Sequence, residues 1–410
     1  MQPFDLEPNQ FSFDNIHRPV LKVLGLGGGG CNAIQRMMEL GISGVEFIAA
    51  NTDQQALAVN SAPTKIHLGP VVTRGLGAGG NPRIGQAAAE ESSREIAEAL
   101  TGADMVFLTA GMGGGTGTGS IPVAARIARS LGAVTIAIVT TPFSFEMGKR
   151  SKNAIEGLNL LRQQTNTLIS IPNDRLLYIA PRKLQIEIAF RLADDVLRQA
   201  VQGITELITE PGLINVDFAH IRRLVQLGGG ALMAIGQGRG EDKARVAVEQ
   251  ALHHPLLESV SIENAAGVIV NFTCGDALSL NEINSGITYL QSQTGPQTET
   301  VFGVIQDDRL EDRVQVILVI TGLGAPTLEE AMASVMQPVK AAPQPEPTPP
   351  VFIPEPIPVT KPVEKVFQTS EPPEPYRQKS EYPLNPHDLD IPAFLRRRAR
   401  MSGQFQVSGS

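Results

Sequence analysis

The sequence predicts an α/β protein, with a mostly parallel sheet covered by helices, then a smaller α+β domain and a tail without regular structure. Three observations support this fold class. Short apolar runs alternate with amphipathic segments from Val20 to Lys183, glycine-rich loops interrupt that alternation, and the composition changes after Ala325. Such alternation is typical of βαβ units, whose ligands bind at the carboxyl ends of the strands.

The segment Met105–Ser120, MVFLTAGMGGGTGTGS, contains the most informative loop. The apolar run Met105–Thr109 predicts a buried strand, and the periodic residues Val123, Ile127 and Leu131 predict a helix after the loop. Glycines between a strand and a helix let the backbone approach an anion, and a helix N-terminus favours negative charge. The chain has no G-x-x-x-x-G-K-[ST] run, so we predict a phosphate site that is not a P-loop.

An earlier loop leaves a second function open. The strand predicted for Val20–Leu24 precedes a G-x-G-x-x-G pattern that begins at Gly25, and the next strand, Val45–Ala50, leads to Asp53. This is where a dinucleotide-binding fold places its ribose ligand, so an NAD-dependent oxidoreductase is an alternative. The further loop Gly75–Gly80, GLGAGG, weakens it, because a dinucleotide needs one such loop whereas a triphosphate with its metal can use several.

The alternation continues beyond these loops. Asn81 and Pro82 are typical of a helix start and open a segment that extends to Leu100. Strands are predicted at Val134–Val139 and Leu168–Ile171. The short loops after these two strands contain Glu146 with Arg150 and then Asn173, which are candidates for contacts to ribose, phosphate or base.

The longest helical pattern, Lys183–Thr209, separates the predicted sheet from a second domain, and Pro211-Gly212 ends it. In the second domain we predict strands at Ala231–Ile235, Val268–Phe272, Val301–Ile305 and Val314–Ile320, and helices near Asp242–Leu252 and Ser279–Gln293. The glycine-containing run Gly236–Gly240 is interpreted as a connecting turn.

Both ends of the chain are polar, and half of its 30 prolines lie between Pro338 and Pro386. That composition predicts an extended linker without a core. Within Asp388–Arg400, an apolar trio precedes four arginines, which is typical of a peptide that docks on a partner protein. The net charge of -8 argues against nucleic-acid binding, and no apolar run is long enough for membrane insertion.

Taken together, these motifs resemble the tubulin/FtsZ family of GTPases, and within it FtsZ. The resemblance rests on GLGGGGCNA, NTD, TRGLGAGGNP, TAGMGGGTGTG, TPFSFE, IPNDRLL, GLINVDFA and LDIPAFLRRR, which occur in this order. It implies a tubulin-like fold, binding of GTP or GDP with Mg²⁺, head-to-tail protofilaments, and a role at the division site on the cytoplasmic face of the cell membrane. The implied organisation is a flexible arm over residues 1–19, a GTP-binding domain over 20–182, a central helix over 183–210, a C-terminal domain over 211–324 with a hydrolytic loop at 212–220, a disordered linker over 325–387, a tail peptide for membrane-tethering and regulatory partners over 388–400, and an extension over 401–410.

The resemblance also assigns residues. Gly28, Gly29 and Asn32 would contact the nucleotide, with Asn32 at the guanine; Ala78, Gly79 and Gly80 would face the γ-phosphate; Gly113, Gly114, Gly115, Thr116, Gly117, Thr118 and Gly119 would face the phosphates; Glu146, Arg150 and Asn173 would hold ribose and phosphate; and Phe190 and Asp194 would contact the base. Met147 stands where the family usually has glycine.

The predicted hydrolytic loop lies far along the chain from the base contact, and it contains a histidine at an expected aspartate position. Asp194 and Glu210 are sixteen residues apart, about 24 Å along a helix, so Asn215, Asp217 and His220 are expected to act on another subunit's nucleotide. His220 stands where the family pattern has a second aspartate, and a histidine brings no negative charge. The resemblance therefore implies slow hydrolysis, with an accessory or non-hydrolysing FtsZ-like paralogue as the alternative.

Overall fold

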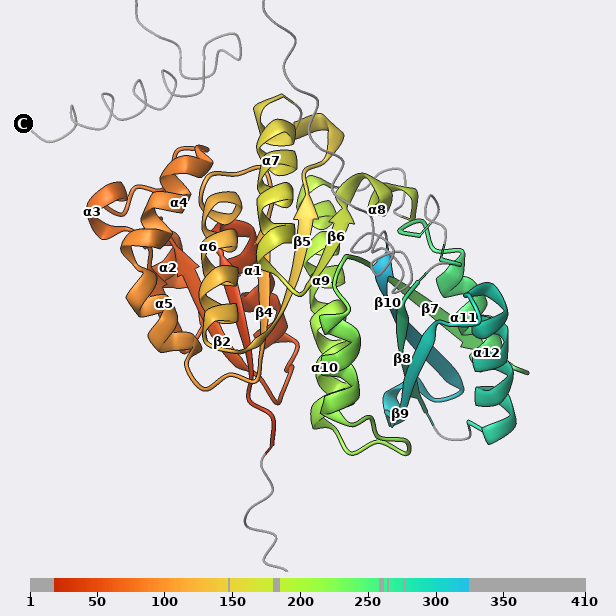
Figure 1. Ribbon diagram of the computed structural model, residues 1–410. Helices are drawn as coiled ribbons and strands as arrows, with labels where there is room; N and C mark the ends of the chain where they lie inside the picture. Colours follow the sequence, from red (N-terminus) through yellow and green to blue (C-terminus); the bar gives the residue numbers. More distant parts are fainter. Residues whose placement is uncertain are drawn as a thin grey trace, which may run out of the picture. The chain divides into compact units, whose positions relative to one another are not determined.

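Buried strands alternate with helices through the first part of the chain, as the sequence predicts (Figure 1). The computed structural model describes residues 18–146, 148–179, 185–257, 262–263, 265–275 and 278–323. The expectations for the N-terminal arm up to residue 17, for Met147, and for the linker, tail peptide and extension lie outside the described residues. The elements of the first part are β1 (Leu21–Leu26), α1 (Gly27–Glu39), β2 (Glu46–Asn51), α2 (Gln54–Val59), β3 (Thr64–His67), α3 (Pro70–Thr73), α4 (Pro82–Glu91), α5 (Ser93–Leu100), β4 (Met105–Gly111), α6 (Thr116–Ser130), β5 (Val134–Thr141), α7 (Lys149–Gln164), β6 (Thr167–Pro172) and α8 (Asn173–Ile179).

The order of the strands places a ligand crevice at the centre of the sheet. The first six strands run in the order β3-β2-β1-β4-β5-β6, and all of their pairings are parallel. The chain therefore leaves β1 toward one edge of the sheet and returns to β4 before it builds the other half. A crevice opens at such a reversal point, outside the carboxyl ends of the two strands. The loops after β1 and β4 are the glycine loops identified from the sequence.

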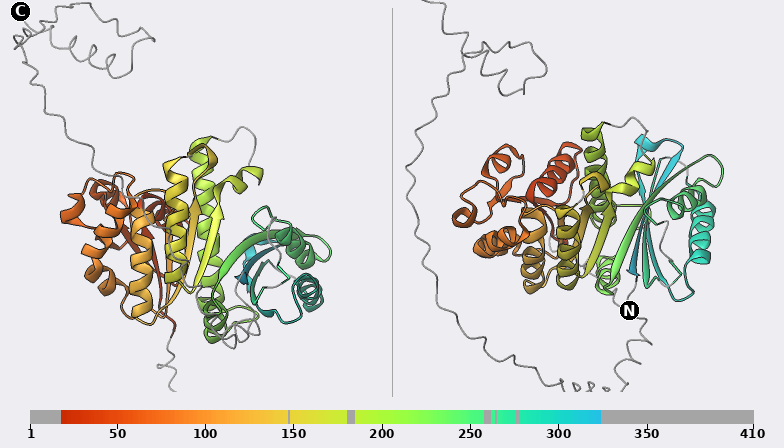
Figure 2. Two further views of the ribbon diagram at one scale, coloured as in Figure 1. Left: turned by 45° about the horizontal axis from the view of Figure 1, so that its top comes forward. Right: turned by 90° about the horizontal axis from the view of Figure 1, so that it is seen from above.

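Two apolar layers cover this sheet, because successive side chains of each strand point to opposite faces. Leu21 and Val23 of β1 pack in one layer together with α1, whereas Leu24 and Leu26 pack in the other together with α4, α5, α6 and α7. The right-hand view of Figure 2 shows the strands between the two layers of helices. This doubly wound arrangement confirms the predicted fold class.

The second part of the described chain forms a mixed sheet that continues the first. It contains β7 (Gly230–Arg239), α11 (Lys243–Leu252), β8 (Gly267–Cys274), α12 (Leu280–Gln293), β9 (Glu299–Gln306) and β10 (Arg313–Leu323). The strands follow the order β7-β10-β8-β9, with antiparallel pairs on both sides of β10 and a parallel pair between β8 and β9. β7 joins β6 through two residue pairs, one of which is Leu168 with Gly230.

The interpretation of Gly236–Gly240 as a connecting turn is wrong for most of this run. Gly236 and Gly238 lie inside β7, beneath α11. A Cβ atom on Gly236 would lie 2.0 Å from the carbonyl oxygen of Ala247, and one on Gly238 would lie 1.9 Å from that of Lys243. The glycines are needed because the helix backbone rests directly on the strand, a reason that short-range sequence patterns do not reveal.

The helix α9 (Ile186–Thr209) connects the two parts and reaches from one end of the sheet to the other. Its 24 residues span about 36 Å. Just past its C-terminus, Glu210 accepts a hydrogen bond from the Ser43 hydroxyl (3.0 Å), and Ser43 precedes β2. The end of α9 therefore lies at the amino ends of the parallel strands, opposite the glycine loops. Asn271 of β8 donates to the carbonyl of Gly203 (3.1 Å) and ties the helix to the second part.

The predicted helix from Pro82 to Leu100 is two helices, α4 and α5. Ser92, between them, is buried, and its hydroxyl accepts a hydrogen bond from the Gly69 N–H (3.0 Å) and donates one to the carbonyl of His67 (3.3 Å). A serine that bonds to neighbouring backbone competes with helix continuation. Within the described part of the chain, no helix combines the length and apolar character needed to cross a membrane.

Candidate functional site

Three glycine loops meet at the carboxyl ends of β1 and β4. A Cβ atom on Gly27 would lie 2.7 Å from the amide nitrogen of Gly117, so the loop after β1 touches the loop after β4. A Cβ atom on Gly115 would lie 2.8 Å from the nitrogen of Asn81, which brings in the loop before α4. Contacts this close require glycine, because any side chain would displace backbone. The sequence predicted each loop separately, and the fold brings them together.

Two helix N-termini point their unpaired N–H groups into this region. Neither α1 nor α6 has a side chain that caps its N-terminus. The first N–H groups of a helix lack intrahelical partners and favour an anion. Gly28, in the first turn of α1, has open space where a side chain would be. Both helices therefore present donors and free volume to the same crevice.

The loop before α4 is shaped by glycines in the left-handed region. Gly77, Gly79 and Gly80 have φ values of 84°, 56° and 70°, and none has an atom within 4 Å of an added Cβ. Ala78 between them is buried. Consecutive residues of this kind expose a row of backbone N–H groups that can surround phosphate oxygens. The residues Ala78, Gly79 and Gly80 thus fit a phosphate, as the resemblance implies.

Asn153 of α7 is bonded to two of the loops, a role that no sequence motif indicated. Its side-chain nitrogen donates to the carbonyl of Gly80 (3.2 Å) and to that of Gly113 (3.1 Å), and the residue is 8% exposed. Gly113 belongs to the loop after β4 and has a φ of 99°. One buried amide therefore joins the loop before α4 to the loop after β4.

The threonines of the loop after β4 form hydrogen bonds within the protein. The Thr118 hydroxyl accepts a hydrogen bond from the Gly113 N–H (2.8 Å) and closes the loop, and the Thr116 hydroxyl lies 2.6 Å from that of Thr52 after β2. Gly119 is a packing position, because a Cβ atom there would lie 2.0 Å from the carbonyl oxygen of Pro82. Among the glycines of this run, Gly114 has no atom within 4 Å of an added Cβ.

The loop after β5 brings Glu146 and Arg150 beside the glycine loops. Glu146 accepts a hydrogen bond from the Phe143 N–H (3.1 Å) and forms an ion pair with Arg150 one turn later. A Cβ atom on Gly113 would lie 2.8 Å from the carbonyl oxygen of Arg150. Phe143 is buried and packs edge-on against Phe190 of α9, with ring centroids 5.5 Å apart. This loop therefore links the phosphate side of the crevice to the central helix.

Asn173, the first residue of α8, is placed to bind a ligand. It is 4% exposed, and its side-chain oxygen is buried without a hydrogen-bond partner among the described residues. An unpaired buried acceptor costs about 1–3 kcal/mol, which a donor on a ligand would recover. Its position after β6 is the one predicted from the sequence.

The carboxyl group of Asp194 on α9 is partly buried, and burial disfavours its charged form. Burial raises the pKa of its carboxyl group to about 7, and the positive charge of Arg36 on α1 opposes that rise. The Nε atom of Arg36 is itself buried and has no hydrogen-bond partner in the described part of the chain. Asn32 lies one turn before Arg36 on α1 and is exposed. The facing surfaces of α1 and α9 thus combine an amide, a cation and a carboxylate.

The predicted hydrolytic loop lies apart from this group. Asn215 accepts a hydrogen bond from the Gly212 N–H (2.7 Å), and Asp217 caps the N-terminus of α10 (Phe218–Gln226) by accepting one from the Ala219 N–H (3.0 Å). Asn215, Asp217 and His220 are exposed and line a hollow of about 280 Å³ next to β9. Because the loop follows the C-terminus of α9, it lies at the opposite end of the sheet from the glycine loops.

Comparison with known proteins identifies the family. A model of the Tubulin/FtsZ family GTPase domain matches residues 20–181, and one of the FtsZ family C-terminal domain matches residues 229–324. A solved FtsZ dimer from M. jannaschii is 46% identical, covers 75% of this chain and 89% of its own, and superimposes with a TM-score of 0.72. The chain belongs to the FtsZ family.

Two other solved structures are similar. A point mutant of the M. jannaschii FtsZ is 45% identical, covers 75% of this chain and 92% of its own, and has a TM-score of 0.72. CetZ2 from Haloferax volcanii, solved as a GTPγS-bound protofilament, is 16% identical, covers 77% and 96%, and shares the fold with a TM-score of 0.63. FtsZ proteins are GTPases that form polymers and act in cell division, so the alternative of an NAD-dependent oxidoreductase is wrong.

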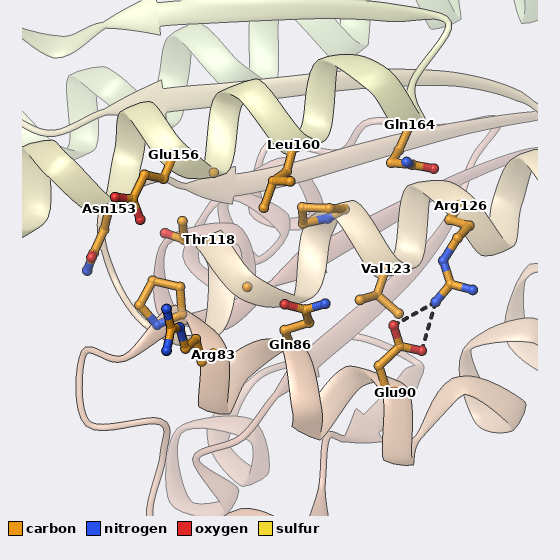
Figure 3. A pocket seen from close by; sticks show the side chains of 14 residues that line it. Arg83, Gln86, Glu90, Thr118, Val123, Arg126, Asn153, Glu156, Leu160 and Gln164 are labelled. Carbon is orange, nitrogen blue, oxygen red and sulfur yellow. Dashed lines mark hydrogen bonds and ion pairs between the residues drawn. The ribbon is translucent and has the colours of Figure 1, made fainter. Parts of the chain in front are cut away.

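A groove next to the glycine loops is lined by Thr118 and Gly119 of the run after β4 and by Asn153 of α7. It has a volume of about 280 Å³ and lies between α4, α6 and α7 (Figure 3). An ion pair between Arg126 of α6 and Glu90 of α4 (2.7 Å) spans it. Its lining includes no residue of the glycine-loop segments 75–80 and 111–117.

We predict that Asn153→Ala weakens GTP binding about tenfold, or about 1.4 kcal/mol, without unfolding the protein. Removing the amide leaves the carbonyls of Gly80 and Gly113 without this donor and lets the two loops separate. Calorimetric titration with GTP measures the change, and thermal unfolding without nucleotide checks the fold. Asn159→Ala, an exposed position on the same helix, is the control. Equal affinity of the two variants for GTP would contradict the prediction.

Proposed function

We propose that this chain is a polymer-forming GTPase of cell division whose hydrolytic site is completed between adjacent subunits. The observation that carries the proposal is the placement of α9. Its N-terminal half borders the crevice that the three glycine loops form, called the glycine crevice below. Its C-terminal end lies beside Ser43, at the amino ends of the parallel strands. Asp217, which follows that end, cannot reach a nucleotide in its own crevice. A second subunit that stacks head to tail brings the loop to the nucleotide.

In the proposed nucleotide complex, the glycine loops hold the phosphates through N–H groups, and Glu146, Arg150 and Asn173 contact ribose and phosphate. Asn32, Phe190 and Asp194 contact the guanine. No carboxylate occurs within residues 75–80 or 111–119, so these loops suit a phosphate chain that brings its own Mg²⁺. Magnesium typically keeps phosphate oxygens and waters as most of its ligands. Bound there, it would neutralise charge that develops on the phosphates.

Asn215, Asp217 and His220 of the next subunit are the proposed hydrolytic residues. The water oxygen bonds to the γ-phosphorus, the bond to the β,γ-bridging oxygen breaks, and GDP leaves with that electron pair. Asp217 can orient the water and accept its proton, and the cap it forms on α10 fixes its position. His220 adds no negative charge, so we expect slower turnover than in relatives with a second aspartate. The accessory-paralogue alternative stays open.

We predict that GTP turnover per subunit rises with protein concentration, because each active site needs two subunits. Turnover and pelleted polymer are measured on the same samples. Asp217→Ala should still form filaments but hydrolyse GTP at least about tenfold more slowly, whereas the control Asp308→Asn, an exposed carboxylate on another loop, should not. Constant turnover per subunit down to concentrations without filaments would refute the shared site.

We predict that GTP affinity depends on the Asp194 carboxylate. The pKa of about 7 means that the empty site is mostly protonated below pH 7, whereas the N–H groups of guanine need the ionised form. Affinity should therefore rise about tenfold between pH 6 and pH 8 and level off above that.

Asp194→Asn should lose this part of the pH dependence and gain affinity for xanthosine triphosphate, because an amide donates to the additional xanthine oxygen. Asp195→Asn is the matched control, since Asp195 bonds Arg198 and Gln199 on its own helix. Titrations of all three proteins at several pH values isolate the effect from titration of the phosphates. Identical pH profiles for native and Asp194→Asn proteins would exclude the carboxylate as the guanine contact.

We further propose that residues 388–400, which lie outside the described residues, bind membrane-tethering and regulatory proteins and bring the polymer to the inner face of the cell membrane at the division site. Truncation after residue 387 should leave polymerisation intact and abolish capture of such partners in pulldowns. Truncation after residue 400 is the control. Loss of polymerisation in the shorter protein would assign this segment to the folded core.

A further inference from the structure

A glutamate from a distant part of the chain shares the hollow of the hydrolytic loop. Glu299, the first residue of β9, lines the same hollow of about 280 Å³ as Asn215, Asp217 and His220. It is about eighty residues away from the loop in sequence, so no local motif includes it. The neighbouring Thr300 also lines the hollow, and its hydroxyl oxygen is buried without a hydrogen-bond partner among the described residues.

The position of Glu299 is fixed by the sheet and by α10. Its strand is paired in parallel with β8, with Glu299 opposite Gly267, and its N–H donates to the carbonyl of Ala266 (3.2 Å). The carboxylate forms an ion pair with Arg223, which is one turn after His220 on α10. The side chain of Glu299 is 32% exposed, so one face is held and another remains open to the hollow.

Glu299 places a second carboxylate in the same hollow as His220, where the loop itself has only the carboxylate of Asp217. Orientation of an attacking water and acceptance of its proton are tasks for carboxylates, and His220 stands where a second one is expected. Arg223 pairs with this carboxylate, so only part of the negative charge of Glu299 is available to the hollow. We therefore expect Glu299 to replace only part of the function of an aspartate at position 220.

We propose that Glu299 is a catalytic residue that supplies the second carboxylate of the intersubunit GTPase site in place of an aspartate at position 220. The inference rests on the proposed shared site. With Asp217 of the same subunit, Glu299 faces the γ-phosphate of the neighbouring subunit and helps to orient the water. The proton that the water loses passes to a carboxylate and then to solvent or phosphate, while GDP takes the electron pair of the broken bond.

The test compares Glu299→Gln in two backgrounds, with turnover expressed per polymerised subunit. In the native chain, E299Q should lower turnover by about tenfold or more at unchanged GTP affinity. His220→Asp should raise turnover several-fold, and adding E299Q to it should change turnover by less than about twofold, because the restored aspartate replaces Glu299. Glu249→Gln, an exposed glutamate on α11 outside the hollow, should leave turnover unchanged.

Native turnover in filaments of E299Q, with Asp217→Ala inactive, overturns this inference and leaves the shared site standing. Native turnover in both variants overturns the shared site itself. An equal loss from E299Q in the native and His220→Asp backgrounds also overturns the inference, because it would indicate a structural role. If E299Q does not assemble alone, mixed filaments with native protein decide the matter: turnover should fall in proportion to the E299Q fraction, and an undiminished rate contradicts the proposal.

Discussion

The rigid length of α9 is the constraint on which the rest of the molecule depends. Asp194 near one end lies against α1 and the glycine crevice, while Glu210 past the other end is bonded to Ser43 at the far side of the sheet. Asn271 also ties this helix to β8 in the second part of the sheet. Under the proposed assignment, the nucleotide crevice and the hydrolytic loop therefore lie at opposite ends of one subunit.

The glycine crevice shows a second constraint, the direct contact of backbone with backbone. Gly27, Gly115 and Gly119 each lie where a methyl group would overlap another loop or helix. Such positions leave the peptide N–H groups as the nearest donors to a ligand, so binding depends on loop spacing more than on side-chain identity. Asn153 controls that spacing, which explains why a residue without an expected ligand contact belongs to the site.

The sequence predicted the doubly wound sheet, the long helix and the glycine loops because these rest on local patterns: apolar periodicity, glycine runs and helix-start residues. It did not predict the break at Ser92, the glycines inside β7, or the roles of Asn153 and Glu299. Each of these depends on a partner distant in sequence, such as Gly69 for Ser92 or Ala247 for Gly236. A local window contains no information about such partners. For the same reason, the pattern at His220 alone suggested a weakened site, and only the position of β9 adds another carboxylate.

The separation of the two half-sites along α9 has a consequence for the ends of a filament. Every internal junction pairs one crevice with one loop, but the two terminal subunits are unequal: one presents an unmatched crevice and the other an unmatched loop. If the proposed shared site is correct, nucleotide in the unmatched crevice lacks Asp217 and stays intact until another subunit arrives. The two ends therefore differ in chemical state as well as in shape. A filament built this way has a direction.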